Sequence, residues 1–377
     1  MRSVIWAIWL DTWRQSRQQI VYLLLAFALL AVALGSVLLV NVRLNPQGQP
    51  MLTLRMQDRP TAGLETIWDQ QYRHAVGGER IDAALRLPGE EMRRTHTELR
   101  QAQREMTRAR SGIAPSAEQA SIAQQFDDAR ERAQKAATDY SRIEKDLEAE
   151  VQVQVDSRAS GVSALAKGVE VWTSKVTVLF FWIIMFGFIS AAAGYFPGMM
   201  KAGAIELMVS KPLGRFQLFM GKYLGGLGLC MAALLGSELV LLVGLGISTG
   251  IWHWGVLSAF PVTLFSAALL FAVVTLIGIA TRSTALSMLG GYAYYAVVDT
   301  AIWAIQSLDA AGLRFKWLEQ IARVSRWAFP GFARLRTAAS AAVLHIPIFD
   351  WQPVLVALVW LLALLAAAYA LFRRIDF

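Results

Sequence analysis

The chain has 377 residues, of which 55% are hydrophobic and only 17% are charged. A soluble domain carries charge on about a quarter of its residues, so this composition, with a mean hydropathy of +0.42, excludes an ordinary soluble protein. The formal net charge of +8 could suggest a nucleic-acid partner. The basic residues gather beside apolar runs, however, which indicates orientation in a membrane and argues against nucleic acid.

Residues 1–19 predict an amphipathic helix. One helical face collects apolar side chains, namely Ile5, Trp6, Trp9 and Trp13, and Arg14 and Arg17 lie elsewhere. Tryptophan prefers the headgroup level of a bilayer, so this helix is expected to lie along the inner membrane surface. The alternative is that it simply extends the first span inward.

Apolar runs of about 20 residues match the hydrocarbon core of a bilayer and must be helical there. The sequence predicts six such spans, at residues 20–42, 171–196, 216–249, 256–281, 285–305 and 353–372. The first run is too long for the apolar part of a signal peptide and is interpreted as a retained anchor. The single cysteine, Cys230, lies inside the third span, which excludes a disulfide framework and a Cys-x-x-Cys site.

The basic residues beside these spans predict a topology with both termini in the cytoplasm. One segment disagrees, because residues 306–352 are placed outside and yet carry Arg314, Lys316, Arg323, Arg326, Arg334 and Arg336. Either this segment forms interfacial or re-entrant helices held by protein contacts, or one span is miscounted. Pro330 and Gly331, followed by a short apolar stretch, favour the first interpretation.

A polar insert at residues 43–170 is predicted to form an extracytoplasmic domain. The pattern of residues 89–150 predicts two helices, separated by a break at Gly112–Pro115. In the second helix, apolar residues recur at alternating steps of four and three, at Ile122, Phe126, Ala129, Ala133, Ala136, Tyr140, Ile143 and Leu147. That spacing is a heptad seam and predicts an antiparallel coiled-coil hairpin. The alternative is a single helix that packs on the rest of the insert.

Two short segments flank the hairpin with alternating apolar and polar residues. They are Leu52–Met56 and Val151–Val155. A period of two is typical of half-buried strands, so we expect these segments to pair as a small β base. The predicted fold class is therefore mainly α: a polytopic six-helix transmembrane bundle with an extracytoplasmic α-helical coiled-coil hairpin domain on a small β base between spans one and two.

No catalytic or metal motif is found in the sequence. Gly221-Lys222 is followed by tyrosine and lacks the upstream glycine of a phosphate-binding loop. The four histidines are scattered without ligand spacing. The chain is therefore expected to be no enzyme by itself, with no catalytic residue, no metal and no cofactor of its own.

Two acids lie inside predicted spans, Glu238 in the third and Asp299 in the fifth. A charge in the membrane is costly and normally faces protein or a water-filled cavity. Lys175, near the outer start of the second span, is a candidate partner for them. The acids could line a substrate path or an interface between subunits. Alternatively, they could be neutralised or paired and stabilise the helix bundle. The sequence leaves these alternatives open.

The segment at residues 197–215 and the start of the next span carry a familiar pattern. An acid, a Ser-Lys-Pro turn, an arginine and a Gly-Lys pair stand there as Glu206, Ser210-Lys211-Pro212, Arg215 and Gly221-Lys222. This pattern resembles the cytoplasmic segment of type-2 ABC-transporter permeases. The amphipathic start and the tail at residues 373–377 are similar to those of the same family, especially the permeases associated with multicopper-enzyme maturation.

The resemblance implies a permease subunit of an exporter in the bacterial cytoplasmic (inner) membrane. A separate cytoplasmic ABC ATPase would bind ATP and magnesium and dock on Glu206, Lys211, Pro212, Arg215, Gly221 and Lys222. Further expected partners are a second permease copy or a paralogue, membrane lipid, and an extracytoplasmic protein at the hairpin. A second hypothesis is a mechanotransmitter, which uses ATP to move the hairpin without translocating a substrate. A third is a membrane anchor or scaffold that works without ATP.

Overall fold

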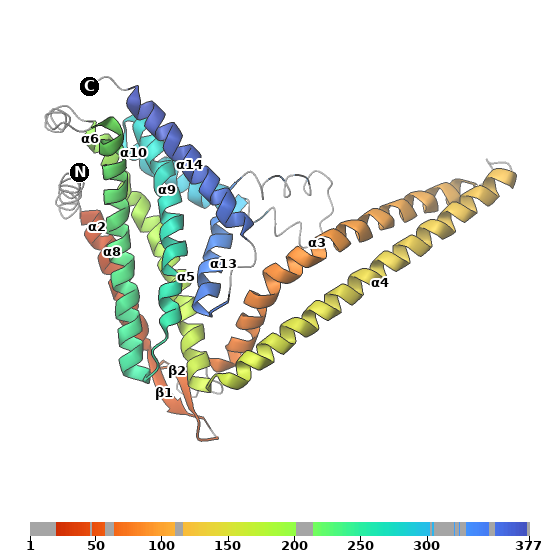
Figure 1. Cartoon of the computed structure of the whole chain (residues 1–377), viewed down its shortest axis with the longest axis horizontal. Coiled ribbons are helices and arrows are strands. Elements are labelled where there is room, and N and C mark those ends of the chain that lie inside the picture. The colour runs from red at the N-terminus through yellow and green to blue at the C-terminus, as the bar shows by residue number, and fades with distance from the viewer. Residues whose placement is uncertain are drawn as a thin grey trace. The chain divides into compact units, whose positions relative to one another are not determined.

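The computed structural model describes residues 20–45, 47–56, 64–109, 116–200, 214–301, 329–346 and 351–374, with isolated residues 304, 320 and 324. The chain forms two compact units (Figure 1). Residues 1–68 and 164–377 make up the first, called here the membrane unit. Residues 69–163 make up the second, called the insert unit. The predicted interfacial helix at residues 1–19 lies outside the described residues.

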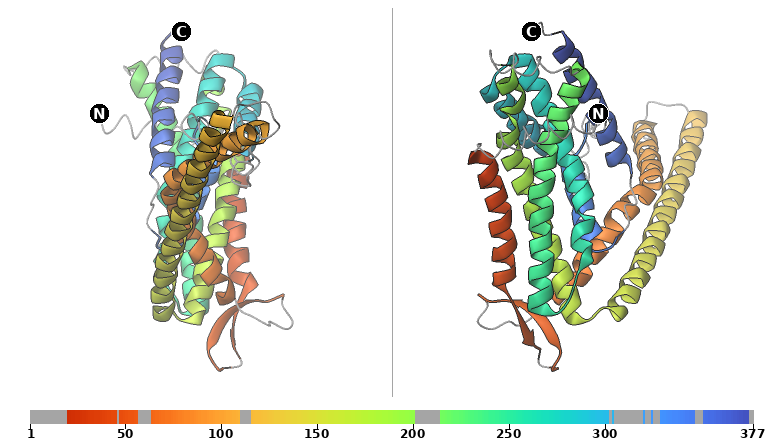
Figure 2. Two further views of the ribbon diagram at one scale, coloured as in Figure 1. Left: turned by 90° about the vertical axis from the view of Figure 1, so that its right-hand side faces the viewer. Right: turned by 60° about the vertical axis from the view of Figure 1, so that its left-hand side comes forward.

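Five helical stretches in the described residues are long and apolar enough to cross a membrane: Val21–Leu39, Ala164–Met199, Arg215–Thr249, Trp254–Thr281 and Gln352–Arg373. They contain helices α2 (Ile20–Leu39), α5 (Ala164–Ala192) with α6 (Tyr195–Met199), α8 (Arg215–Thr249), η2 (Trp254–Ser258) with α9 (Phe260–Thr281), and α14 (Gln352–Arg373). Their ribbons lie side by side in Figures 1 and 2.

The predicted span at residues 285–305 has a different local structure. Its described part is α10 (Thr284–Tyr292), which continues as η3 (Ala293–Asp299), a π-helical segment. A π-helix has hydrogen bonds between residues five apart, where an α-helix has them between residues four apart, so its turn is wider. Such segments often mark functional sites. The six-span count is not confirmed, because most of the residues that follow Thr300 up to Phe329 lie outside the described part.

The core of the membrane unit forms where α9 packs against α5, α8, α10 and α14. Helix α2 packs on both α5 and α8. Two contacts fix the register of α2 on α8: the Tyr22 hydroxyl donates to the Leu229 carbonyl, and Val37 lies against Gly244. Both pairs are separated by 207 residues, so the two helices run parallel with constant register. Gly244 permits this approach, since a Cβ atom there would meet Cγ2 of Val37 at 2.6 Å.

A β-hairpin follows α2, formed by β1 (Val40–Leu44) and β2 (Pro50–Leu54) in antiparallel register from Val40↔Leu54 to Leu44↔Pro50. Gly48 takes a positive φ of 78° in the turn, which a residue without a Cβ adopts freely. The predicted span at residues 20–42 therefore ends as helix at Leu39. The β base is made by this hairpin alone within the described residues, and the predicted pairing of Leu52–Met56 with Val151–Val155 is wrong.

The insert unit is formed by the two longest helices that the structure describes, α4 (Ser116–Gly161) and all of α3 (Glu65–Arg108) beyond Trp68. They lie side by side and run antiparallel (Figures 1 and 2). Three contacts set their register: Gly77 with Val151, Gly89 with Tyr140, and Glu98 with Arg132 at 3.3 Å. Both helices extend beyond the predicted hairpin of residues 89–150, and Pro88 lies inside α3 without ending it.

The segment Val151–Val155 is helical because α4 continues through it. Residues four apart lie on one face of a helix and residues two apart do not. Accordingly Val151 and Val155 are only 2% and 1% exposed, whereas Val153 is 67% exposed. Three valines at every second position thus fit a strand pattern and a helix with one exposed valine equally well, and the long helix decides between them.

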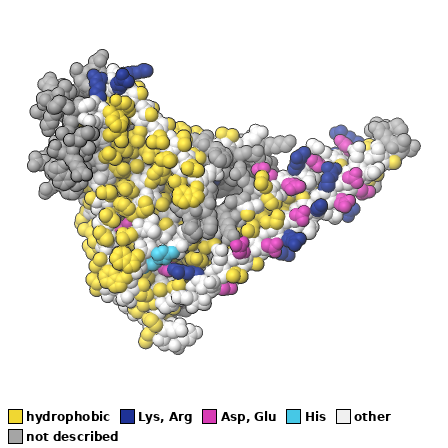
Figure 3. All heavy atoms as spheres, viewed as in Figure 1, with side chains coloured by type: hydrophobic (Ala, Val, Ile, Leu, Met, Phe, Trp, Pro, Cys, Tyr) yellow, Lys and Arg dark blue, Asp and Glu magenta, His cyan; other side chains and the backbone are white. Residues whose placement is uncertain are grey.

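The residues of the predicted heptad seam all lie on the sheltered side of α4. None of the eight is exposed, and Ala129 and Ala133 are 3% and 2% exposed. Coiled-coil packing between α3 and α4 stays a prediction. Figure 3 shows the contrast in surface chemistry: hydrophobic side chains cover the membrane helices, and charged side chains gather along α3 and α4.

Candidate functional site

Three of the predicted ATPase-coupling residues are described, and the first of them, Arg215, is the residue at which α8 begins. Glu206, Lys211 and Pro212 lie outside the described residues. Arg215 opens α8, and its Nη1 donates a hydrogen bond of 2.6 Å to the carbonyl oxygen of Arg373, at the end of α14. A cation that bonds a carbonyl at the carboxyl end of a helix also complements the helix dipole. The first turn of α8 and the last turn of α14 are therefore tied together.

Gly221 and Lys222 lie two turns further along α8. Gly221 is half-buried, and Lys222 is only 2% exposed. A protein that docks on the surface would thus not touch the Lys222 side chain in this conformation. Of the predicted coupling residues that the structure describes, Arg215 is the one at the surface.

Glu238, the predicted acid of the third span, is fully enclosed by the membrane unit. It is 1% exposed, and its Oε2 atom has no hydrogen-bond partner among the described residues. Lys175 is exposed and forms no ion pair with Glu238 or Asp299 in this part of the chain. The structure therefore does not bring the three predicted intramembrane residues together.

Asp299 has defined partners. Its Oδ1 atom accepts hydrogen bonds from the backbone N–H groups of Phe332 at 2.8 Å and Ala333 at 3.3 Å. These residues begin α13 (Phe332–Val343). The first N–H groups of a helix have no partner inside it, so Asp299 caps α13 from a distant element. Asp299 is itself 8% exposed.

Helix α13 belongs to the basic segment at residues 306–352. It packs on α5, α9 and η2 through Phe332, Leu335, Ala339 and Val343. Further contacts join Ser174 to the Ser340 carbonyl at 3.3 Å and His253 Nε2 to the Val343 carbonyl at 2.9 Å. Protein contacts thus hold α13, and the interfacial or re-entrant position of the segment stays a prediction.

An arginine and a group of aromatic side chains surround the Asp299 cap. The Arg336 guanidinium lies 4.6 Å from the ring centroid of Trp182 on α5. Trp182 stacks on Phe186 with ring centroids 5.6 Å apart, and Tyr295 meets both rings edge-on. Sequence reasoning placed Arg336 among six basic residues without singling it out. Its position four residues after Phe332, and one after the apolar Leu335, was the available signal.

A second constellation that sequence reasoning missed lies where α3 begins. Trp68, in the first turn of α3, is completely buried, and its Nε1 atom donates a 2.7 Å hydrogen bond to Oε2 of Glu170 on α5. Lys167 Nζ lies 5.0 Å from the Trp68 ring centroid. We call Trp68, Lys167 and Glu170 the α3–α5 joint. An acid beside a lysine at the start of an apolar span was the signal for it.

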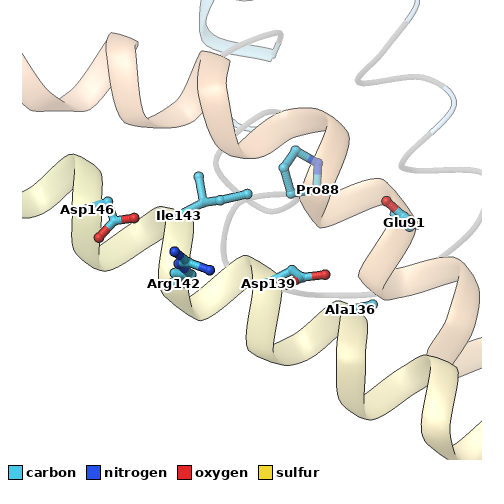
Figure 4. A pocket seen from close by; sticks show the side chains of 7 residues that line it. All are labelled: Pro88, Glu91, Ala136, Asp139, Arg142, Ile143 and Asp146. Atoms are coloured by element: carbon cyan, nitrogen blue, oxygen red, sulfur yellow. The ribbon is translucent and has the colours of Figure 1, made fainter.

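The remaining polar groups of the described residues do not gather as metal ligands do. No cluster of three or more metal-ligating side chains occurs among the described residues. A pocket of about 470 Å³ lies in the insert unit between α3 and α4, lined by Pro88, Glu91, Ala136, Asp139, Arg142, Ile143 and Asp146 (Figure 4). It is open to solvent, and Pro88 of α3 forms part of its lining.

Comparison with known proteins agrees with the membrane architecture. No curated protein and no solved structure matches the chain. One family model, described as "ABC-2 family transporter protein", matches residues 6–377. This match covers both the membrane helices and the insert between them. The chain therefore belongs to the ABC-2 transporter family, which makes it a membrane-embedded permease component of an ABC transporter.

Proposed function

We propose that the chain is the permease subunit of an exporter and that a separate cytoplasmic ABC ATPase drives it. The tie between Arg215 and Arg373 carries the proposal. Residues 201–213, which contain the predicted docking residues Glu206, Lys211 and Pro212, connect α6 to α8, so a partner that pushes on them acts on both helices. Through the 2.6 Å bond from Arg215 to the Arg373 carbonyl, the same push reaches α14.

The bundle can transmit such a push without deforming. Phe219 in the second turn of α8 contacts Tyr369 and Phe372 of α14 and Phe196 of α6, with ring centroids 5.4 to 5.8 Å apart. Packed aromatic rings resist compression, because protein interiors have the density of organic crystals. Helices α6, α8 and α14 would then move as one body when the ATPase closes.

The experiment tests docking and transmission separately. The chain is purified with its bound subunits from its native membrane, and we expect an ABC ATPase to copurify. Addition of ATP and vanadate should change the limited-proteolysis pattern of the permease. In Arg215→Ala the ATPase should still hydrolyse ATP, but the change in pattern should be lost. Lys175→Ala, an exposed cation on α5, is the matched control and should behave as wild type.

Absence of a copurifying ATPase would contradict the proposal and favour an anchor or scaffold. An Arg215→Ala complex with an unchanged proteolysis response would show that α8 is not the coupling element. A second permease copy or a paralogue, and an extracytoplasmic protein at the insert, belong to the same proposal. The same purification tests for them.

A second candidate function is mechanotransmission, and the α3–α5 joint favours it. Helix α5 runs without a break from Ala164 to Ala192, and its Glu170 holds Trp68 at the start of α3. A shift of α5 would therefore carry the first turn of α3 with it. The two functions are separated by transport: mechanotransmission predicts that ATP moves α3 and α4 while no substrate crosses the membrane.

A further inference from the structure

Three arginines stand where two of the membrane helices end. Arg282 directly follows α9, Arg373 is the last residue of α14, and Arg374 comes next. All three are exposed, and within the described part of the chain their side chains form no hydrogen bond and no ion pair. The five N–H donors of each guanidinium are therefore available for an acceptor. We call these three residues the arginine rim.

The two helix ends lie at the same end of the membrane unit. Gly278, in the last turn of α9, lies against Pro197 of α6. Phe372, in the last turn of α14, packs against Phe219 of α8. The ring of Phe219 also contacts Phe196 of α6, so α6 and the start of α8 connect the two ends. Figure 3 shows Lys and Arg side chains gathered at this end, next to a hydrophobic surface.

No carboxylate balances the arginine rim among the described residues at this end. The stretches 192–200, 214–222, 275–292 and 364–374 contain no Asp and no Glu. The neighbouring cation Arg215 donates to the Arg373 carbonyl and adds to the positive charge. The described part of this end is thus a surface of one sign, which attracts anions.

The length of α14 places Arg373 and Arg374 at the level of lipid headgroups. The helix has 22 residues, which rise about 33 Å, close to the roughly 30 Å thickness of the hydrocarbon core of a bilayer. Trp351, directly before the helix, is 57% exposed, and tryptophan prefers the headgroup level. The two arginines therefore lie in the opposite headgroup layer, where the anions are lipid phosphates. Helix α9 also has 22 residues, which gives Arg282 the same depth.

The backbone of Arg282 gives a second indication that its side chain has a function. Arg282 ends α9 with φ 52° and ψ 20°, in the left-handed region, and its N–H donates to the Gly278 carbonyl at 2.9 Å. Glycine is the residue that usually takes this position at a helix end, because a side chain makes the conformation costly. Residues held in such conformations cluster at functional sites.

We propose that the arginine rim binds the phosphate groups of anionic lipids in the leaflet that borders this end of the membrane unit. A guanidinium can donate two parallel N–H bonds to one phosphate. The fatty chains of the lipid lie along α14, where Leu371 is 37% exposed two residues before Arg373. A zwitterionic lipid binds less tightly, since its own cation offsets its phosphate. This inference goes beyond the permease function and does not depend on an ATPase.

The test uses the purified full-length chain in detergent, without ATPase, and native mass spectrometry to count the lipids bound at a series of lipid concentrations. The probes are dioleoyl phosphatidylglycerol and dioleoyl phosphatidylcholine, which share their fatty chains and differ in headgroup charge. Phosphatidylglycerol should bind about 5-fold tighter for each arginine that it meets, the value of one basic residue near an anionic surface. Glycerol 3-phosphate should not displace it. Displacement by this free anion would overturn the assignment to lipid.

Substitutions then test the arginines themselves. Arg373→Gln and Arg374→Gln should each weaken phosphatidylglycerol binding about 5-fold and leave phosphatidylcholine binding unchanged. Arg130→Gln removes an exposed cation from α4 and is the matched control, which should bind both lipids as wild type does.

Arg282→Gly separates lipid binding from folding. Glycine suits the left-handed backbone, so thermal stability in detergent without added lipid should be unchanged or raised, while the affinity for phosphatidylglycerol should fall. Lower stability with unchanged lipid affinity would show that Arg282 has a structural role only and would overturn its place in the site. Equal affinity of the wild-type chain for the two lipids would overturn the whole proposal and assign the arginine rim to an acidic protein surface. Because no ATPase is present, these outcomes are independent of the coupling experiment.

Discussion

The indole Nε1 of Trp68 donates a hydrogen bond of 2.7 Å to Oε2 of Glu170, 102 residues away in the chain. Both side chains are buried, with Trp68 at 0% and Glu170 at 4% exposure. The bond fastens the first turn of α3 to the start of α5, in the same place where Leu52 of β2 packs against Gly168. The boundary of the membrane unit, which ends at Trp68 and resumes at Ala164, is thus held by a specific contact.

Trp68→Phe should destabilise the membrane unit more than Trp172→Phe. Each change removes one indole N–H, but Trp68 donates to a carboxylate and Trp172 to the Ser36 carbonyl at 3.1 Å. Hydrogen bonds to charged groups contribute about 1.5–3 kcal/mol and neutral ones about 1 kcal/mol. The free energy of unfolding, measured by denaturant titration in bicelles, should fall by those amounts. Equal losses in the two variants would show that the Glu170 charge contributes nothing.

Gly244→Ala should loosen the packing of α2 on α8, and Gly236→Ala should not. A Cβ atom at Gly244 would meet Cγ2 of Val37 at 2.6 Å, whereas nothing lies within 4 Å of a Cβ at Gly236. Valine has one preferred rotamer in a helix and cannot turn away, so overpacking should cost about 1–3 kcal/mol. Thermal unfolding in detergent is the measurement. A Gly244→Ala variant as stable as Gly236→Ala would mean that the two helices are not in close contact.

Sequence reasoning located the membrane helices well, because their signal is an uninterrupted apolar run that the bilayer itself requires. Five helical stretches of the structure coincide with predicted spans. Sequence reasoning failed where the same apolar spacing fits both the two-residue period of a strand and the turn of a helix. Val151, Val153 and Val155 fit a strand and a helix alike, and the length of α4 decided in favour of the helix.

The polar contacts of the membrane unit could not be predicted from the sequence. The distance between Trp68 and Glu170, or between Asp299 and the start of α13, depends on how helices far apart in the chain pack. Glu238 and Asp299 looked equivalent as acids in apolar runs. In the structure one has an unpartnered carboxylate oxygen, and the other caps a helix.

That difference predicts opposite results for the two acids. Asp299→Ala removes the acceptor for two backbone N–H groups and should cost about 0.5–2 kcal/mol, as the loss of a helix cap does. Asp299→Asn keeps the accepting oxygen and should cost less. Glu238→Met removes a buried carboxyl group with an unpartnered oxygen and should leave stability unchanged or raised, since well-packed apolar replacements of buried charges are often tolerated. Denaturant titration checks the order of the three variants.

A large loss of stability in Glu238→Met would contradict this reading of Glu238 and point to a partner beyond the described residues. The transport assay then adds information that stability cannot give. A Glu238→Met protein that is stable but inactive would assign the acid to the substrate path, and a stable, active one would exclude that role.

Cysteine accessibility should place Lys211 on the cytoplasmic side of the membrane. The native Cys230 is completely buried, so a membrane-impermeant maleimide should give little background. Lys211→Cys should react in inverted membrane vesicles and stay unlabelled in intact cells. Thr138→Cys, at an exposed position of α4, is the control for the opposite side and should react only from outside. The coupling proposal requires this polarity, because ATP and its hydrolase are cytoplasmic. Labelling of Lys211→Cys from outside would therefore end the proposal, whatever the stability of the bundle.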